Sequence, residues 1–283
     1  MEEFSIEYSI ENIYESQVKK ANYELLLLPA TNTLQVLKEF TITCSEEILP
    51  FSSPNIFGFN KLSYYIDKPF STILFTLFAK VEIQKTNPFS ITQLTSFDEF
   101  RIIHSDEFQI DNFLFARSSS LTTMPKENSI EFPRFTGDES MFNHLLELNR
   151  FIYNLLEYSP QSTDVNTAIV DILNIRKGVC QDFAHLFISV CRQNKIPARY
   201  VTGYLNQGEA FIGASQLHAW VEVLIPELGW IGFDATNNLL ADYHYIKIAH
   251  GTDYNDCSPI VGVLETSGKQ KSNHLVIVKN QQQ

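Results

Sequence analysis

The chain has 283 residues, of which 44% are hydrophobic and 13% aromatic, including 22 Phe and 12 Tyr. This length corresponds to one large or two ordinary domains, and the composition supplies a real core and excludes a largely disordered chain. The 33 acidic residues outnumber the 21 basic ones and give a net charge of −12. We therefore expect neither nucleic acid nor an anionic membrane as a partner.

Neither the N-terminus nor the cysteines indicate an extracellular protein. The chain begins Met-Glu-Glu-Phe-Ser, without the apolar region of a secretory signal. Its longest apolar stretch, about residues 73–79, is far shorter than the ~20 residues of a membrane helix. Cys44, Cys180, Cys191 and Cys257 are far apart, which argues against a disulfide framework and against a zinc ribbon. We predict a reduced, cytoplasmic protein and leave its oligomeric state open.

The first half of the chain is predicted to form β-strands. The clearest is Thr72–Gln84, where apolar and polar side chains alternate with the period of a strand that buries one face. Weaker strand candidates are Tyr23–Leu28, Gln35–Cys44 and Lys61–Ile66. Short strands separated by turn residues are typical of a β-sandwich. We expect residues 1–135 to form this sandwich, with a separate core and no catalytic residue.

The second half, residues 136–283, is predicted to be a catalytic core of the α+β class. Apolar residues recur at helical spacing over about 142–156, 163–175 and 178–195. The strands predicted after them are Arg199–Leu205, Leu217–Ile225, Trp230–Ala235 and, at the C-terminus, His274–Val278. Helices followed by strands indicate helices packed on an antiparallel sheet, to which we also assign the C-terminal strand.

The segment Gly-Val-Cys-Gln-Asp-Phe-Ala-His-Leu (178–186) holds the candidate nucleophile. Cys180 falls in the first helical turn, where unpaired backbone N–H groups and the helix dipole favour a thiolate. Cys191 lies on nearly the same face without any such feature, so we interpret it as core; about 16 Å of helix between the two excludes a disulfide. His185 points about 140° away from Cys180 and is interpreted as structural. A small buried residue on an apolar stripe remains the alternative interpretation of Cys180.

A thiolate nucleophile needs an imidazole partner, which in turn needs an acceptor. His218 opens one predicted strand and Asp234 lies in the next, with the turn Pro-Glu-Leu-Gly (226–229) between them. A hairpin there pairs Asp234 with Trp220 or with His218, and either register makes the His and Asp side chains direct or diagonal neighbours on one face. A chance polar pair is the alternative. Cys180, His218 and Asp234 could in principle bind zinc, but three residues of different types, one at a helix N-terminus, fit a catalytic triad better than a zinc site. We therefore expect no metal and no cofactor.

Four segments of the second half occur in a fixed order. They are residues 178–186, Ile-Pro-Ala-Arg-Tyr-Val-Thr-Gly-Tyr-Leu (196–205), His-Ala-Trp-Val-Glu-Val (218–223) and Gly-Trp-Ile-Gly-Phe-Asp-Ala-Thr-Asn (229–237). Together they closely resemble the core of the bacterial transglutaminase-like superfamily, of the type described as cysteine proteases. The resemblance is strong over about 150–263 and looser over about 5–125, which is similar to the N-terminal β accessory domain often found with this core.

The resemblance implies a papain-like arrangement in which a helix carrying Cys packs on a sheet carrying His and Asp. Cys180 would then be the nucleophile, His218 the general base and acid, and Asp234 the residue that orients His218. Asp182 and Arg199 also match family positions, and we expect them to form a supporting ion pair.

The donor to the oxyanion is less well indicated. Animal transglutaminases supply an indole N–H from a Trp upstream of the Cys, whereas both tryptophans of this chain, Trp220 and Trp230, follow Cys180. The Cys180 backbone N–H therefore needs a second donor, for which Tyr158 and Gln181 are the candidates. Trp220, beside His218, either forms a wall of the substrate site or only packs.

We therefore expect a cysteine hydrolase or acyl-transfer enzyme that cleaves a peptide or isopeptide amide bond of a protein or peptide substrate through a thioester. Transfer to a lysine amine would make it a protein-glutamine transglutaminase. A non-catalytic peptide-binding module is the alternative from another class. The complete Cys/His/Asp set favours an enzyme, and the resemblance favours a hydrolase.

Overall fold

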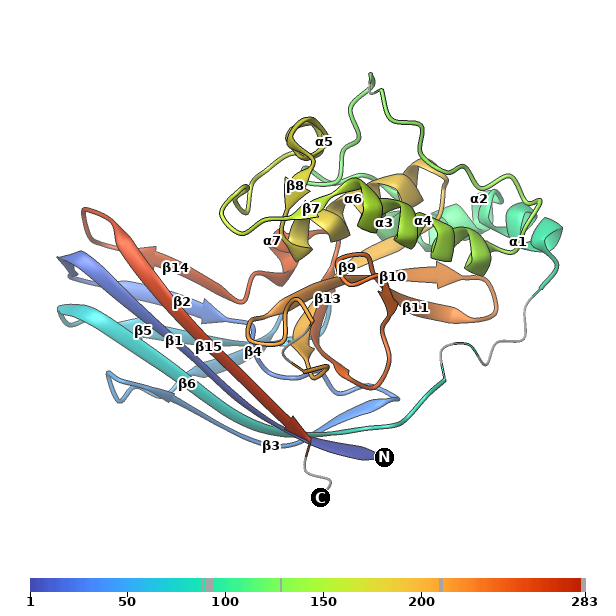
Figure 1. Cartoon of the computed structure of the whole chain (residues 1–283). Coiled ribbons are helices and arrows are strands. Elements are labelled where there is room, and N and C mark those ends of the chain that lie inside the picture. Colours follow the sequence, from blue (N-terminus) through green and yellow to red (C-terminus); the bar gives the residue numbers. More distant parts are fainter. Residues whose placement is uncertain (88, 90–93, 128, 209–210, 281–283) are drawn as a thin grey trace.

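The computed structural model describes residues 1–87, 89, 94–127, 129–208 and 211–280. It contains a β region and a body of helices packed on a third sheet (Figure 1). This arrangement of helices and antiparallel sheets confirms the α+β class. Among the described residues, no helix combines the length and apolarity needed to cross a bilayer.

The β region consists of two four-stranded antiparallel sheets. Its strands are β1 (Glu2–Val18), β2 (Ala21–Leu25), β3 (Gln35–Cys44), β4 (Phe51–Pro54), β5 (Asn60–Ile66), β6 (Phe70–Ile83), β14 (Ile260–Leu264) and β15 (Gln270–Asn280). One sheet has the order β15-β1-β6-β3 and the other β14-β2-β5-β4. The rings of Tyr23 on β2 and Tyr64 on β5 lie 5.3 and 5.0 Å from the Phe75 ring on β6. The two sheets therefore face each other across an aromatic core.

The core body is built on a five-stranded antiparallel sheet with the order β12-β11-β10-β9-β13. Its strands are β9 (Ala198–Leu205), β10 (His218–Ile225), β11 (Gly229–Asp234), β12 (Leu239–Leu240) and β13 (Tyr245–Gly251). The helices around it are α4 (Met141–Leu155), α5 (Ile169–Ile175), α6 (Cys180–Gln193) and α7 (Tyr254–Cys257), and a short parallel pair joins β7 (Glu157–Tyr158) to β8 (Lys177–Gly178).

Helix α6 is the centre of this body. It packs against β9 and β10 and is contacted by α4 and α5 (Figure 1). Every residue from 181 to 192 is buried, so the helix is held on all sides and cannot turn about its axis without disrupting the core. A residue at its N-terminal end is therefore fixed relative to the sheet.

The sequence predicted most of these elements but missed β1, the short strand β4 and three helices of the first half. Strand β1 was not predicted, although Phe4, Ile6, Tyr8 and Ile10 alternate along it and are buried. The expectation of strands alone up to about residue 125 is wrong, because α1 (Ser96–Ile103), α2 (Asp106–Asp111) and α3 (Phe113–Ala116) are helices. The hydroxyls of Thr95 and Ser105 accept N–H bonds from the first turns of α1 and α2, and these caps were the local signal of helix starts.

The C-terminal strands join the β region, so their assignment to the core of residues 136–283 is wrong. Strand β15 lies beside β1, from Phe4 opposite Asn280 to Tyr14 opposite Gln270 (Figure 1), and β14 pairs with β2. A separate core for the β region is wrong as well, because buried residues of both regions form one continuous hydrophobic cluster. Sequence periodicity predicts that a strand exists, whereas its partner is chosen by long-range packing.

The boundary at residue 135 also shifts toward the N-terminus. Arg192 of α6, only 6% exposed, donates to the carbonyl of Phe115 at 3.1 Å and to the hydroxyl of Thr122 at 2.6 Å. The helical segment 96–116 is thus bonded to the central helix of the core.

These contacts predict that residues 136–283 alone do not fold cooperatively. Without β1 and β2 the strands β14 and β15 lose their partners, and the continuous cluster is cut open. We expect the fragment to show no calorimetric unfolding transition, while the full chain shows one. A fragment that unfolds cooperatively within about 5 °C of the full chain, a shift of only about 2 kcal/mol, would contradict this prediction.

Candidate active site

Cys180 is the first residue of α6 and is a free, partly exposed cysteine. The N-terminus of the helix is capped by Asp182, whose Oδ2 accepts the Val179 N–H at 2.7 Å and the Thr163 hydroxyl at 2.6 Å. The backbone N–H of Cys180, in the first turn, has no acceptor within the helix. This end of α6 therefore presents a thiol and a free N–H side by side.

The ion pair that we expected between Asp182 and Arg199 does not form. Arg199 instead lies opposite Glu222 in the β9–β10 register and bonds to it at 2.6 Å, and Lys247 reaches the same carboxylate at 2.6 Å. Asp182 is occupied in capping α6. The expectation was wrong because it placed the two side chains by motif, whereas helix capping and strand register decide their partners.

His218 and Asp234 form a fully buried pair. The His218 Nε2 lies 2.7 Å from Oδ2 of Asp234, and both side chains are 0% exposed. In the β10–β11 hairpin Val221 pairs with Phe233. Continuing this register puts Trp220 opposite Asp234, so His218 is the diagonal neighbour of the carboxylate.

Asp234 accepts four further hydrogen bonds. Its Oδ2 is reached by the Tyr245 hydroxyl at 2.9 Å and the Asn237 side-chain amide at 2.8 Å. Its Oδ1 accepts the backbone N–H of Thr236 at 2.9 Å and that of Asn237 at 3.3 Å. Burial raises the pKa of Asp234, but the charge and hydrogen bond of His218 and the bonds of Asn237 and Tyr245 outweigh it and lower the pKa. The carboxylate is thus ionised and held in one orientation.

The imidazole is charged because of its two neighbours. Burial lowers the pKa of His218, but the charge and hydrogen bond of Asp234, followed by those of Cys180, raise it to about 10. The Nδ1 atom makes no hydrogen bond of strict geometry with any described group, so the interaction with the thiol is a loose one, as is common in free enzymes. With Nε2 turned to Asp234, Nδ1 is the nitrogen left for Cys180.

The two candidates for the second oxyanion donor differ. The Gln181 amide is 7% exposed and donates to the Val165 carbonyl at 3.2 Å, so it is engaged away from the thiol. Tyr158 pairs with Gly178 in the β7–β8 ladder, two residues before Cys180. Burial and then the nearby charge of Cys180 raise the pKa of Tyr158, which keeps its hydroxyl protonated and able to donate. Tyr158 is therefore the better placed of the two.

The Trp220 ring stacks against the imidazole ring of His218. Its ring is 6.5 Å from that of His218 at an interplanar angle of 25°, and it also meets Tyr245 edge-on at 5.4 Å. The side chain is 2% exposed, so a substrate would touch almost none of it. Its contribution is to support the orientation of His218 by packing.

The other histidine of the motif, His185, faces Tyr254. Its Nε2 accepts the Tyr254 backbone N–H at 3.2 Å, and burial lowers the pKa of His185 to about 3. A neutral, buried imidazole agrees with the structural role expected for it.

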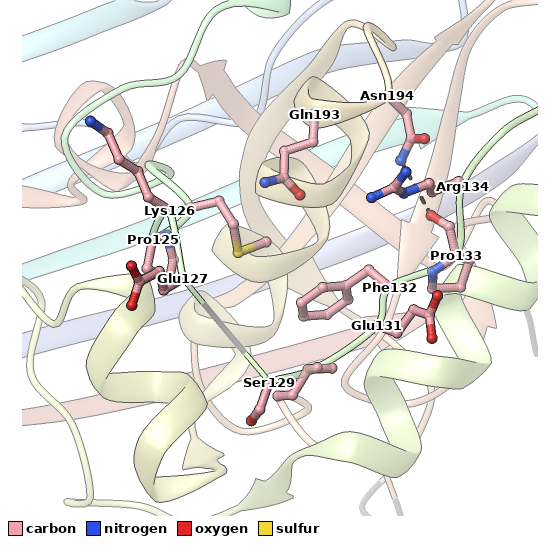
Figure 2. Close-up of a pocket in the computed structure, with 12 residues that line it drawn as sticks. Pro125, Lys126, Glu127, Ser129, Glu131, Phe132, Pro133, Arg134, Gln193 and Asn194 are labelled. Atoms are coloured by element: carbon pink, nitrogen blue, oxygen red, sulfur yellow. Dashed lines mark hydrogen bonds between the residues drawn. The ribbon is translucent and has the colours of Figure 1, made fainter.

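A hollow of about 910 Å³ lies away from Cys180. Gln193 and Asn194, at the C-terminal end of α6, line it together with Pro133 (Figure 2). Cys180 is thirteen residues away along the helix, roughly 20 Å at 1.5 Å per residue. Among the described residues, no group of three or more His, Cys, Asp or Glu is arranged to hold a metal ion.

Sequence reasoning missed the residues that surround Asp234 and His218. Asn237 ended one of the motif segments, and an Asn three residues after an Asp at a strand end is a usual turn signal. Tyr245 comes from β13, which was not predicted. Gly213, which packs on the imidazole, lies in a loop without any regular pattern.

The raised pKa of His218 predicts a pH-dependent contribution to stability. A group whose pKa is raised on folding stabilises fully below its unfolded pKa, about 6.5 for His, and this contribution is lost as the pH rises toward about 10. Between about pH 7 and 10 the melting temperature of the wild type should therefore fall more steeply than that of His218→Gln. His144→Gln is the control, because burial lowers the pKa of His144 and leaves it neutral in this range. Parallel curves for wild type and His218→Gln would contradict the prediction.

Comparisons with known proteins agree with this description. Residues 133–235, which include all three candidate triad residues, match the family model of the transglutaminase-like superfamily. A crystal structure described as a "Putative Cysteine Protease from Cytophaga hutchinsonii" aligns with the whole of this chain. The alignment covers 91% of that structure's chain, with a TM-score of 0.71 and 23% sequence identity. That similarity extends over the β region and the core, and it establishes the shared fold.

Two bacterial relatives match part of the chain. An uncharacterized protein of Mycobacterium tuberculosis is 36% identical over 146 residues, which are 48% of this chain and 46% of that protein. The match thus spans less than half the length of this relative. The protein-glutamine gamma-glutamyltransferase of Pseudomonas aeruginosa is 34% identical over 97 residues, 31% of this chain and 14% of that protein. Residues 133–235 thus match the transglutaminase-like superfamily, and the shared fold and the bacterial relatives agree with that match.

Proposed function

We propose that this protein is a cysteine hydrolase that cleaves peptide or isopeptide amide bonds, with Cys180 as nucleophile, His218 as general acid and base, and Asp234 as the residue that orients His218. The observation that carries the proposal is the buried, hydrogen-bonded His218–Asp234 pair beside the thiol at the start of α6. A binding module gains nothing from burying this pair, since taking two charged side chains out of water costs several kcal/mol per ion.

The first half of the reaction is the attack on the amide. The Cys180 sulfur adds to the carbonyl carbon, and the carbonyl oxygen becomes an oxyanion. The Cys180 backbone N–H and the Tyr158 hydroxyl donate to it, in the logic of an oxyanion hole. His218 then transfers its Nδ1 proton to the amide nitrogen, the C–N bond breaks, and an amine and a thioester on Cys180 result.

The second half releases the acyl group. The neutral Nδ1 of His218 takes a proton from water as its oxygen attacks the thioester, and collapse of this intermediate frees the carboxylic acid and the Cys180 sulfur. Throughout both halves Asp234 accepts the Nε2–H at 2.7 Å, which fixes the tautomer and stabilises the imidazolium.

Substitutions in the triad should separate these roles. We expect Cys180→Ala and His218→Ala to lower kcat/KM for a peptide amide by a factor on the order of 10⁴–10⁶, and Asp234→Asn roughly tenfold to a hundredfold less severely. In addition, iodoacetamide should alkylate Cys180 in the wild type, and His218→Ala should slow this alkylation because the imidazole that activates the thiol is removed.

Cys191→Ser is the matched control for the nucleophile. Cys191 is buried on the same helix, and burial raises the pKa of its thiol. This variant should lose stability but keep its turnover per folded molecule. Activity that survives Cys180→Ala and disappears in Cys191→Ser would show that the nucleophile is misassigned.

The acceptor of the acyl group is decided by a separate experiment. The same thioester transferred to a lysine amine would make the protein a transglutaminase, the activity named for the Pseudomonas aeruginosa relative. We expect a glutamine-containing peptide with excess primary amine to give mainly free acid. A predominant amide product, detected by mass spectrometry, would replace hydrolysis by transamidation while leaving the triad assignment intact.

A further inference from the structure

Residues 211–217, the segment that leads into β10, approach the His218 imidazole at Gly213. This segment is a series of turns in which the Ala214 N–H donates to the Phe211 carbonyl at 3.4 Å and the Gln216 N–H to the Gly213 carbonyl at 3.3 Å. The His218 side chain is 0% exposed. The nitrogen that must give a proton to the leaving amine is thus shut off from solvent in the free protein.

Gly213 is the residue of this segment in contact with the imidazole. Its φ of +99° favours glycine, and a Cβ at this position would lie 2.4 Å from Nδ1 of His218 and 2.6 Å from its Cγ. Only the absence of a side chain lets the backbone approach Nδ1 this closely. The leaving amine has to reach the same atom, so segment 211–217 must move away when substrate binds.

Asn237 connects this segment to the carboxylate of Asp234. The side-chain Oδ1 accepts the Ile212 N–H at 3.0 Å, and Nδ2 donates to the Ile212 carbonyl at 3.0 Å. The same Nδ2 also donates to Oδ2 of Asp234 at 2.8 Å, the oxygen that holds His218. One amide group therefore pairs with both backbone groups of Ile212 and with the triad carboxylate.

We propose that Asn237 is a positioning residue, which fastens segment 211–217 over His218 and at the same time fixes the carboxylate that orients the imidazole. The segment acts as a cover that opens to admit substrate and closes to restrict water at Nδ1. This inference rests on the proposed triad. It predicts that removing the hydrogen bonds of the Asn237 side chain increases access to Cys180 and lowers turnover.

The structure offers two ways to disturb the cover. Asn237→Ala removes all three side-chain hydrogen bonds, so we expect kcat to fall by roughly 10–100-fold through misorientation of the imidazole. KM should change little, and alkylation of Cys180 by a bulky maleimide, measured at about pH 10 where an ordinary thiol is ionised without help from an imidazole, should become several-fold faster. Asn237→Asp keeps an acceptor for the Ile212 N–H but loses the donor to Asp234, so it should also lower kcat.

A pair of glycines provides the matched control. Gly213 and Gly208 both have positive φ, +99° and +79°, but a Cβ at Gly208 meets nothing within 4 Å. Both Gly→Ala variants carry the same kind of backbone strain, and only Gly213→Ala intrudes on His218. We expect Gly213→Ala to lower kcat and speed Cys180 alkylation, and Gly208→Ala to leave both unchanged.

The readouts separate this inference from the proposed function. Alkylation, localised to Cys180 by mass spectrometry on variants with measured melting temperatures, reports the cover without any need for turnover. If Cys180 is alkylated no faster in Asn237→Ala and Gly213→Ala than in Gly208→Ala, the proposed cover is wrong, even when the wild type is active. Wild-type protein without turnover on any amide would overturn the hydrolase, while faster alkylation of the two variants would still support the cover.

Discussion

The buried contact between His218 and Asp234 is the constraint on which the rest of the site depends. Removing two charged side chains from water costs several kcal/mol per ion, and only mutual attraction and further hydrogen bonds offset this. Asp234 obtains them from Tyr245, from Asn237 and from its own turn. These donors come from strand β13 and from the turn after β11, so the sheet register, β13 and this turn must all be in place before the pair is stable.

The second requirement is the fixed position of α6. The helix is buried from residue 181 to 192 and is capped by Asp182, which leaves Cys180 partly exposed at its N-terminal end. A rigid helix and a register-locked hairpin therefore bring the thiol and the imidazole together, while the adaptable part of the site is the irregular segment over His218. Rigid groups for chemistry and a movable cover for access agree with the usual division of labour in enzymes.

The β region contributes by bonding to one edge of the five-stranded sheet. Gln35 donates to the Lys247 carbonyl at 2.8 Å and accepts its N–H at 2.9 Å, and the Ala30 N–H donates to the same carbonyl at 2.8 Å. Lys247 lies on the edge strand β13, two residues after Tyr245. These bonds cover an otherwise open sheet edge, and with the return of β15 to β1 they make the β region part of the support for Asp234.

The sequence by itself determined the residues with local signals: the alternation of β6, the apolar stripe of α6, the cysteine in its first turn, and the hairpin that brings His218 and Asp234 to one face. The tertiary structure decided what depends on distant partners. Arg199 forms its ion pair with Glu222 and not with Asp182, and β15 pairs with β1 and not with a strand of the core. Asn237 accepts a hydrogen bond from Ile212, which lies in a loop without periodicity. Periodicity and capping act within a few residues of the chain. Strand pairing and buried hydrogen bonds are selected among all surfaces of the folded molecule, and no local pattern records that selection.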